Sequence, residues 1–327
     1  MKAIQIFNHG NTDQLTIADL EMPTLQNEEV LIQVKAISIN HFDILSRKGI
    51  YPNMKLPRIL GMDCAGVVVS SKDPLGRWKA GERVLVLGET LGLGGPGAYS
   101  EYVNVPYQEV FAIPNSISFE EAANIGISYL TALYVTKYKI GDLKDKYVLI
   151  PGISGGVASS LLQFCKLFGA KTIVTSRMEG HCTSAVEMGA DYAFQNSDPN
   201  AIAKIREVTD GRGVSIVLNA VGGPTIPFSI QCLQGNGGQL YLIGTCAGKD
   251  VELNLFQILL KEISLIGCNF GSLLPEERGK IYEEFLGFVK QKKFQIKVDR
   301  IFPLAEAKEA HTYMESGNHF GKILLKP

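Results

Sequence analysis

Short apolar or alternating runs, interrupted by glycine and proline, fill the first third of the chain. They lie at residues 3–7, 30–36, 65–69 and 83–87. Runs of this length with such breaks predict β-strands rather than helices. The glycine-dense segment 90–96 that follows predicts a loop. We therefore expect an irregular β-barrel or sandwich in this part of the chain.

The pattern changes near Ser118, and from there helices alternate with strands. Ser118 and Glu121 form the polar pair of a capping box, and apolar residues recur at helical spacing from there to Tyr138. Strand-like runs then follow at residues 147–150, 171–175, 192–194, 214–218, 239–243 and 263–266. Helical patterns separate most of these runs, and such alternation predicts an α/β fold with a doubly wound parallel sheet.

The end of the chain predicts a few further elements that return to the β-rich part. Helical patterns cover residues 275–290 and 305–315, and strand patterns cover 298–302 and 322–325. The predicted organisation is a first part of the β-rich domain over residues 1–118, a nucleotide-binding domain over 119–267, and a return to the first domain over 268–327.

Composition and charge exclude several classes of protein. The chain has 327 residues, 46% of them hydrophobic, which is enough for two domains. The net charge of −1 gives no basic excess that would attract nucleic acid or an anionic lipid surface. No apolar run approaches the ~18 residues of a membrane span, and the start of the chain lacks the apolar core of a signal peptide. We therefore expect a soluble, cytoplasmic protein.

Cysteine and histidine spacing gives no support for a metal site. The 6 cysteines are scattered singly without a C-x-x-C pair, and no two of the 5 histidines share a helical face at i, i+3 or i, i+4 spacing. We expect no bound metal.

A glycine loop directly after the strand at 147–150 is the first candidate for chemistry. It contains Gly152, Ser154, Gly155, Gly156 and Val157, and a helical pattern begins immediately after it. Glycines allow a tight turn and a close approach to a pyrophosphate, whose charge the helix amide groups then meet. An ordinary tight turn is the alternative, but the alternating strand and helix context favours a dinucleotide site.

The end of the next strand indicates which dinucleotide is bound. An acidic residue normally holds the ribose of NAD here, whereas an arginine suits the 2′-phosphate of NADP. This chain has Ser176 and Arg177 at that place, and no carboxylate until Glu179. We therefore expect NADPH, with Arg177 as the phosphate partner and Ser176 as a hydrogen-bond donor; a solvated surface arginine is the alternative. Strand ends near Asn219, Val221 and Gly244 are placed to line the rest of the cofactor.

Several separated motifs together resemble those of one superfamily. They lie at residues 40–52, 56–68, 152–158, 265–271 and 321–327. Over almost its whole length the chain resembles the medium-chain dehydrogenase/reductase superfamily, and within it the zinc-free quinone oxidoreductase, or zeta-crystallin-like, branch. The resemblance implies a GroES-like catalytic domain beside a Rossmann domain. It also implies cofactor contacts at Phe270 and Gly271, and a homodimer formed through the last sheet strand near residues 260–267.

Zinc-bearing members of the superfamily carry ligands at positions that correspond to Asn40, Met62 and Ile125 here. None of these three side chains can replace that set of ligands. Because oxidation of an unactivated alcohol needs a Lewis acid, the resemblance disfavours alcohol dehydrogenation. It implies hydride transfer from NADPH to a quinone, or to an activated alkene such as an enal or enone, without metal.

The resemblance also assigns the catalytic candidates. Tyr51 would donate a hydrogen bond to the oxygen that gains negative charge, Asn40 would line the same cleft, and Thr131 would contact the nicotinamide side. Packing roles remain the alternative for Tyr51 and Thr131. Gly317 stands where relatives often carry an arginine, which leaves Arg177, helped by Lys322, as the phosphate contact.

Two other functions stay open. An enoyl-thioester reductase would need basic residues for a coenzyme A or carrier phosphate, and the sequence offers Arg47, Lys48, Lys55 and Arg58; these charges are as well explained by a solvated rim. An NADPH-binding protein with little turnover is the second, because the glycine loop alone does not demonstrate catalysis.

Overall fold

The computed structural model describes residues 1–50, 54–291 and 293–327. It divides into two compact units. The first unit is Met1–Ile127, Gly271–Leu286 and Gln295–Pro327, and the second is Ser128–Phe270 and Gly287–Phe294. The chain thus passes between the units after Ile127 and after Phe270, later than the boundaries expected at residues 118 and 267. The short segment Gly287–Phe294 of the second unit was not anticipated from the sequence.

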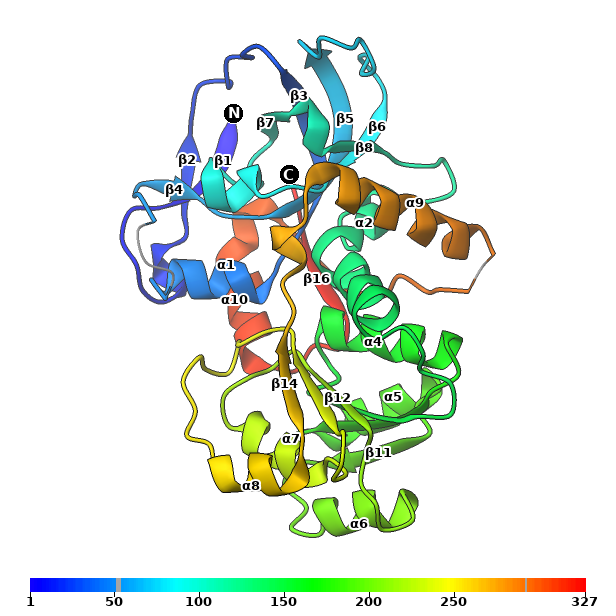
Figure 1. Cartoon of the computed structure of the whole chain (residues 1–327). Coiled ribbons are helices and arrows are strands. Elements are labelled where there is room, and N and C mark those ends of the chain that lie inside the picture. The colour runs from blue at the N-terminus through cyan, green and yellow to red at the C-terminus, as the bar shows by residue number, and fades with distance from the viewer. Residues whose placement is uncertain (51–53, 292) are drawn as a thin grey trace. The chain divides into compact units, whose positions relative to one another are not determined.

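The first unit is built on β-sheets (Figure 1). Its elements are β1 (Lys2–Ile6), β2 (Thr16–Asp19), β3 (Glu29–Ser38), α1 (His41–Arg47), β4 (Arg58–Ile59), β5 (Asp63–Ser71), β6 (Arg83–Val86), β7 (Tyr102–Pro106), β8 (Val110–Ala112), α2 (Phe119–Ala122), β15 (Val298–Pro303), α10 (Ala307–Ser316) and β16 (Lys322–Lys326). The strands form a 3-stranded sheet, β2-β1-β4, and a 7-stranded sheet, β15-β16-β3-β5-β6-β8 with β7 on β3. Helix α9 (Pro275–Lys290) begins in this unit, and its last four residues belong to the second.

Strand β3 organises the larger sheet because most of its side chains are buried. It pairs with β5, β7 and β16, so the C-terminal strand lies directly beside a strand from the start of the chain. Pairing across the whole length of the sequence brings Lys322, at the start of β16, close to the residues that follow β3. The start of the sequence motif at residues 40–52 therefore meets the motif at residues 321–327 in space.

The second unit contains a 6-stranded parallel sheet in the order β11-β10-β9-β12-β13-β14. Its elements are β9 (Tyr147–Pro151), α4 (Gly156–Leu167), β10 (Lys171–Ser176), α5 (Glu179–Glu187), β11 (Tyr192–Gln195), α6 (Ala201–Val208), β12 (Ile216–Asn219), α7 (Thr225–Cys232), β13 (Gln239–Leu242), α8 (Leu255–Lys261) and β14 (Ser264–Gly267). All of the strand pairs are parallel. The α/β fold and the doubly wound sheet are confirmed, and each predicted strand is present with its ends shifted by two residues or fewer.

The helical segment after Ser118 is less regular than its pattern predicts. The capping box forms, with Ser118 N–H donating to Glu121 and Glu121 N–H donating to the Ser118 hydroxyl. Short α-helical turns then alternate with π-helical stretches at Ile125–Leu130 and Tyr134–Ile140. Such π-helical turns are common near functional sites. Among the described residues, no helix combines the length and apolarity that a bilayer crossing requires.

Candidate cofactor and active site

The glycine loop of the second unit joins β9 to α4. Gly152 has a φ of 68°, which favours glycine, and a Cβ at this position would collide with a methyl group of Val221. The N–H groups of Gly152 and Ile153 both donate to the Thr175 carbonyl, at 2.9 and 3.2 Å. The loop is thereby fixed to the end of β10 on one side and to the loop after β12 on the other.

The other side of the loop is open. Gly155 is the N-cap of α4, and a Cβ built on it would meet no atom within 4 Å. The amide groups of the first helical turn, including Gly156 and Val157, have no acceptor within the helix. Open space beside these amides and the positive end of the helix dipole suit a pyrophosphate. Ser154 is partly exposed next to them.

Ser176 and Arg177 differ in what they can offer a phosphate. Ser176 is buried, its hydroxyl accepts from Met178 N–H at 3.2 Å, and it lies 3.2 Å from His181 Nδ1. This hydroxyl is engaged in its own turn, and its hydrogen bond to the cofactor stays a prediction. Arg177 is exposed, and it makes no hydrogen bond or ion pair with any of the described residues.

The positive charge of Arg177 acts electrostatically on the loop after β13. Burial raises the pKa of the Cys246 thiol, and the Arg177 guanidinium opposes that shift. Arg177 therefore lies close enough to this loop to act on it electrostatically. Its exposed guanidinium remains available to an anion at the end of β10.

Asn219 holds the loop after β12 through hydrogen bonds from its side chain. The side chain is fully buried, and its amide nitrogen donates to Thr225 Oγ1 at 2.9 Å and Ser229 Oγ at 3.1 Å. Its Oδ1 accepts from the N–H groups of Val221 and Gly222 at 2.9 and 2.8 Å. Because all of its polar atoms are occupied, the cofactor contacts predicted for Asn219 could come only from the loop that it shapes.

The loops after β12 and β13 pack closely together. A Cβ on Gly244 would lie 2.6 Å from the Ala220 carbonyl oxygen, and one on Gly222 would lie 2.7 Å from the Thr245 backbone. Substitution would force these two loops apart. The structure therefore brings Val221 and Gly244 together with the glycine loop, at the carboxyl ends of neighbouring strands.

The remaining predicted cofactor contacts are divided between the units. Thr131 begins α3 (Thr131–Leu133) and is 8% exposed. The Phe270 ring packs edge-on against Tyr134 at 6.0 Å, within the second unit. Gly271 belongs to the first unit, where its carbonyl accepts a hydrogen bond from Arg278.

A buried polar cluster forms in the first unit around Asn40. Lys322 Nζ donates to Asn40 Oδ1 at 2.6 Å and to the Ile39 carbonyl at 2.9 Å, and Asn40 Nδ2 donates to Asp63 Oδ2 at 2.9 Å. Asp43 accepts from Asn40 N–H at 2.8 Å and from Gly61 N–H at 3.1 Å. Burial raises the pKa of Asp43 to about 7 and also raises that of Asp63.

This cluster corrects the expectation for Lys322. Its side chain is buried, its ammonium is bonded to Asn40 and Ile39, and burial lowers its pKa to about 8 against the opposing charges of Asp63 and Asp43. The ammonium is therefore committed inside the first unit rather than presented to a cofactor phosphate. A lysine within the apolar strand 322–326 was the available signal, but the sequence alone did not identify its partners.

The residues at the zinc-ligand positions do not fit that metal. Ile125 is fully buried and offers no donor, and both ends of the Asn40 amide are occupied by Lys322 and Asp63. An ammonium 2.6 Å from the amide oxygen would also repel a cation. Within the described residues, no group of three His, Cys, Asp or Glu side chains is arranged to hold a metal ion.

The basic residues considered for a carrier phosphate are mostly engaged elsewhere. Arg47 is fully buried and paired with Glu315 at 2.7 Å, and Lys48 pairs with the same carboxylate. Arg58 donates to the carbonyl groups of Leu93 and Gly95. Lys55 is exposed.

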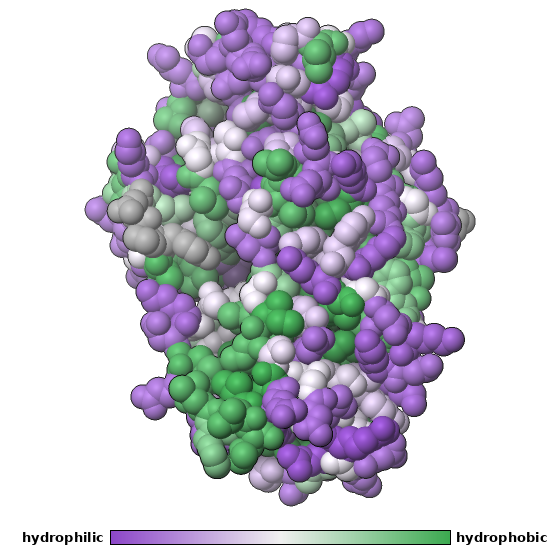
Figure 2. Space-filling model, viewed as in Figure 1, coloured by the Kyte–Doolittle hydropathy of each residue, from purple (hydrophilic) through white to green (hydrophobic). Residues whose placement is uncertain are grey.

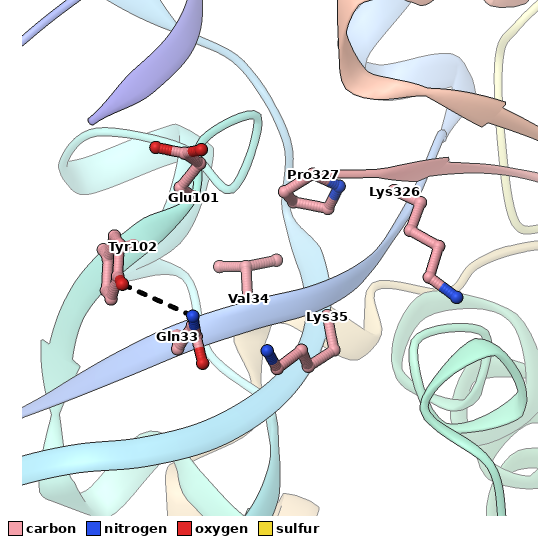
Figure 3. A pocket seen from close by; sticks show the side chains of 7 residues that line it. All are labelled: Gln33, Val34, Lys35, Glu101, Tyr102, Lys326 and Pro327. Atoms are coloured by element: carbon pink, nitrogen blue, oxygen red, sulfur yellow. Dashed lines mark hydrogen bonds between the residues drawn. The ribbon is translucent and has the colours of Figure 1, made fainter.

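Tyr51, the predicted hydrogen-bond donor, lies outside the described residues. A hollow of about 270 Å³ on the first unit is lined by residues of β3, β7 and the C-terminus, where Gln33 donates to the Tyr102 hydroxyl at 3.3 Å (Figure 3). None of the predicted site residues lines it.

The parallel sheet, its glycine loop and the β-rich unit together define a dinucleotide-dependent dehydrogenase or reductase. Two family descriptions match the chain: "Alcohol dehydrogenase GroES-like domain" over residues 26–115 and "Zinc-binding dehydrogenase" over residues 156–290. The second name belongs to the family and does not describe the donor set found here.

Relatives along the whole chain narrow this class. A quinone oxidoreductase of Pseudomonas aeruginosa is 29% identical over 330 residues, covering 100% of this chain and 99% of the relative. The crystal structure of Escherichia coli quinone oxidoreductase complexed with NADPH is 27% identical, covers 100% of both chains and has a TM-score of 0.93. A structure described as an NAD-dependent alcohol dehydrogenase is 29% identical, covers 100% of both chains and has a TM-score of 0.91. The chain belongs to the medium-chain dehydrogenase/reductase superfamily, in its quinone oxidoreductase branch, and is an oxidoreductase.

Proposed function

We propose that this chain transfers hydride from NADPH to quinones, or to activated alkenes such as enals and enones, without a metal. The observation that carries the proposal is the pairing of an open glycine loop with the exposed Arg177 at the end of β10. Glu179, the first carboxylate after that strand, is already inside α5. An arginine without a neighbouring carboxylate at this position favours a 2′-phosphate over a free ribose hydroxyl.

The residues present fit NADPH, which supplies the hydride when bound. The amides of Gly155, Gly156 and Val157 would meet the pyrophosphate, and Arg177 would meet the 2′-phosphate. The loops that carry Val221 and Gly244 would line the remainder of the dinucleotide. The NADPH-bound relative from Escherichia coli supports this assignment, and the NAD-dependent relative is the reason to test it.

The acceptor needs little assistance if it is a quinone. Reduction leaves negative charge on oxygen, which a fixed hydrogen-bond donor stabilises. We propose Tyr51 for this role and Thr131 as a neighbour of the nicotinamide. Asn40 is unsuited to donate, because Asp63 takes one amide hydrogen at 2.9 Å and Ser38 O lies 3.4 Å from the same nitrogen.

An enoyl-thioester reductase is less well supported. Arg47, Lys48 and Arg58, three of the four basic residues considered for its carrier phosphate, bind protein groups. A second copy of the chain remains the proposed partner, and the cytoplasm remains the proposed location.

Consumption of NADPH with a panel of acceptors tests the proposal. Quinones, enals, enones and enoyl thioesters would each be offered to the purified chain while the nicotinamide absorbance is followed. We expect steady turnover with quinones and weaker turnover with enals or enones. Turnover restricted to enoyl thioesters would favour the alternative reductase. A thermal shift with NADPH but no turnover with any acceptor would favour a binding protein.

A further inference from the structure

A cation, an amide and a carboxylate form a hydrogen-bonded chain inside the first unit. Lys322, Asn40 and Asp63 are each no more than 5% exposed, and the bonds between them are 2.6 and 2.9 Å long. An ammonium only donates and an ionised carboxylate only accepts. The Asn40 amide is therefore held in one orientation, with its oxygen toward Lys322 and its nitrogen toward Asp63.

Asp63, at the far end of these hydrogen bonds, contacts a backbone segment that leads to the helix of Thr131. Asp63 accepts from Ile127 N–H at 3.3 Å, and a Cβ on Gly126 would collide with its carboxylate. These two residues lie in the π-helical stretch Ile125–Leu130, which runs directly into Thr131. The carboxylate thus fixes the first turn of a segment that ends at a proposed cofactor neighbour.

The ammonium also balances a second carboxylate. Asp43 is fully buried, and Lys322 acts on both Asp43 and Asp63 to oppose the rise in pKa that burial causes. Arg47, the other buried cation nearby, is already paired with Glu315. Burial lowers the pKa of His41 to about 4, with His319 and Lys322 acting in the same direction, so this histidine is neutral. Without Lys322, the two carboxylates would lose the cation that acts on both.

We propose that Lys322 is a positioning residue for hydride transfer. Its ammonium holds Asn40 and, through it, Asp63 against the Gly126–Ile127 peptide. From this peptide the chain continues directly to Thr131. This role in turnover rests on the proposed reductase function. The charge balance between Lys322 and the two carboxylates does not depend on that function. The experiment below therefore tests the role in turnover and the charge balance separately.

Matched substitutions on one strand separate this role from general stability. Lys322→Met removes the buried ammonium, and Lys326→Met removes an exposed lysine of β16 that pairs with Glu120 at the surface. We expect Lys322→Met to lower Tm by about 10 °C, because it strands two buried carboxylates. We expect Lys326→Met to lower it by less than about 2 °C, as is usual for surface pairs.

The turnover number tests positioning. At a temperature where both variants are folded, we expect kcat with a quinone to fall about tenfold or more in Lys322→Met, and to stay within about twofold of wild type in Lys326→Met. We expect KM for NADPH to change little in either, because Lys322 does not face the phosphate. A fall in Tm with unchanged kcat would overturn the positioning role and leave Lys322 with a structural one only.

A double variant tests the charge balance even if Lys322→Met folds poorly. Adding Asp63→Asn removes one of the stranded charges, so we expect Lys322→Met with Asp63→Asn to regain part of the lost Tm at pH 8. The Tm deficit of Lys322→Met should also shrink as pH falls, since its carboxylates then become neutral. Additive Tm losses without any pH effect would overturn the charge-balance argument. The Tm measurements remain informative even if the wild type does not turn over quinones. That result would contradict the proposed function instead.

Discussion

At the level of a single residue, Arg177 is proposed to set the preference for NADPH over NADH. Replacing it by Ala should raise KM for NADPH about tenfold or more, because a charge-assisted bond to the 2′-phosphate is lost. KM for NADH should change less than about twofold. Steady-state kinetics with both cofactors provides the measurement, and Lys171→Ala, at the exposed start of the same strand, is the matched control. Equal changes for NADPH and NADH would refute the assignment.

Tyr51 carries the proposed hydrogen bond to the acceptor. Tyr51→Phe should lower kcat at least about tenfold, equivalent to about 1.4 kcal/mol of transition-state stabilisation. Tyr102→Phe, in the hollow of the first unit, serves as a control that removes a hydroxyl elsewhere. An unchanged rate in Tyr51→Phe would assign this residue to packing.

Asp43 makes stability depend on pH. Its folded pKa is raised from 3.8 to about 7 by burial, so the folded chain binds a proton that the unfolded chain has released between these values. The contribution of Asp43 is therefore greatest at low pH and is lost as pH rises through about 7. Wild type should lose stability relative to Asp43→Asn over this range when Tm is measured against pH. Parallel curves would show that this carboxyl does not titrate there.

The contacts within the polar cluster could not be predicted from the sequence. Arg177 and the glycine loop were identifiable because strand, loop and helix follow one another along the chain. Asn40, Asp63 and Lys322 meet only through the pairing of β16 with β3 and of β3 with β5. No local pattern indicates that pairing, so the sequence assigned Lys322 to a phosphate and Asn40 to the cleft.

The β9–loop–α4 element allows a test of how tightly the cofactor loop is built. Gly152 and Gly189 both have positive φ, at 68° and 98°, but only Gly152 would place a Cβ against another side chain, that of Val221. Gly189→Ala should cost about 1 kcal/mol for the left-handed backbone alone. Gly152→Ala should cost more and abolish the thermal shift produced by NADPH.

Relief of the collision provides the control for that experiment. In the double variant Gly152→Ala with Val221→Ala, the stability loss should be smaller than the sum of the single losses, because the colliding methyl group is gone. Equal losses for Gly152→Ala and Gly189→Ala would contradict the close packing of this loop.

The strands were more predictable than the helix that precedes them. Each run of the parallel sheet is short, apolar and bounded by turns, which determines both its type and its limits. The segment from Phe119 to Ile140 has a sound start at Ser118, where the capping box forms. Its interior is apolar on most sides, so the pattern could not reveal where π-helical turns replace α-helix.

On the scale of the molecule, one apolar face of the second unit is open to solvent. The large exposed side chains of α8 are Leu255, Phe256, Leu259 and Leu260, and Leu265 on β14 is also exposed. Figure 2 shows apolar surface gathered at the lower left, in the region of α8 in Figure 1. Within the described residues, strand β14 ends the sheet and pairs with β13 alone. An open strand edge beside a large apolar patch is typical of a surface that another chain covers.

A charged pair on α8 tests the expected homodimer. Leu259→Glu together with Leu260→Glu should convert the dimer to a monomer, since burying two carboxylates in an apolar interface is unfavourable. Leu75→Glu, at another exposed leucine in the first unit, should leave the mass unchanged. Light scattering measures the outcome, and a monomeric wild type would exclude the homodimer.

The family follows from motifs spread along the whole chain, and the sequence was sufficient to recognise it. The division of the chain into two units was harder to predict from the sequence. Segment Gly287–Phe294 belongs to the second unit because Phe288 and Phe294 pack against Phe164 of α4, at 6.1 and 4.4 Å between ring centroids. Aromatic residues at the end of an amphipathic helix do not reveal which unit they join.

Metal-free reduction with NADPH is the central claim, and cofactor oxidation after chelation tests it most directly. The purified chain would be treated with a strong chelator, and kcat/KM would be measured for NADPH and for NADH with a simple para-quinone as acceptor. We predict undiminished turnover and a preference for NADPH of about tenfold or more, corresponding to about 1.4 kcal/mol. Loss of activity on chelation with recovery on adding zinc, or an equal or greater kcat/KM for NADH, would contradict the account.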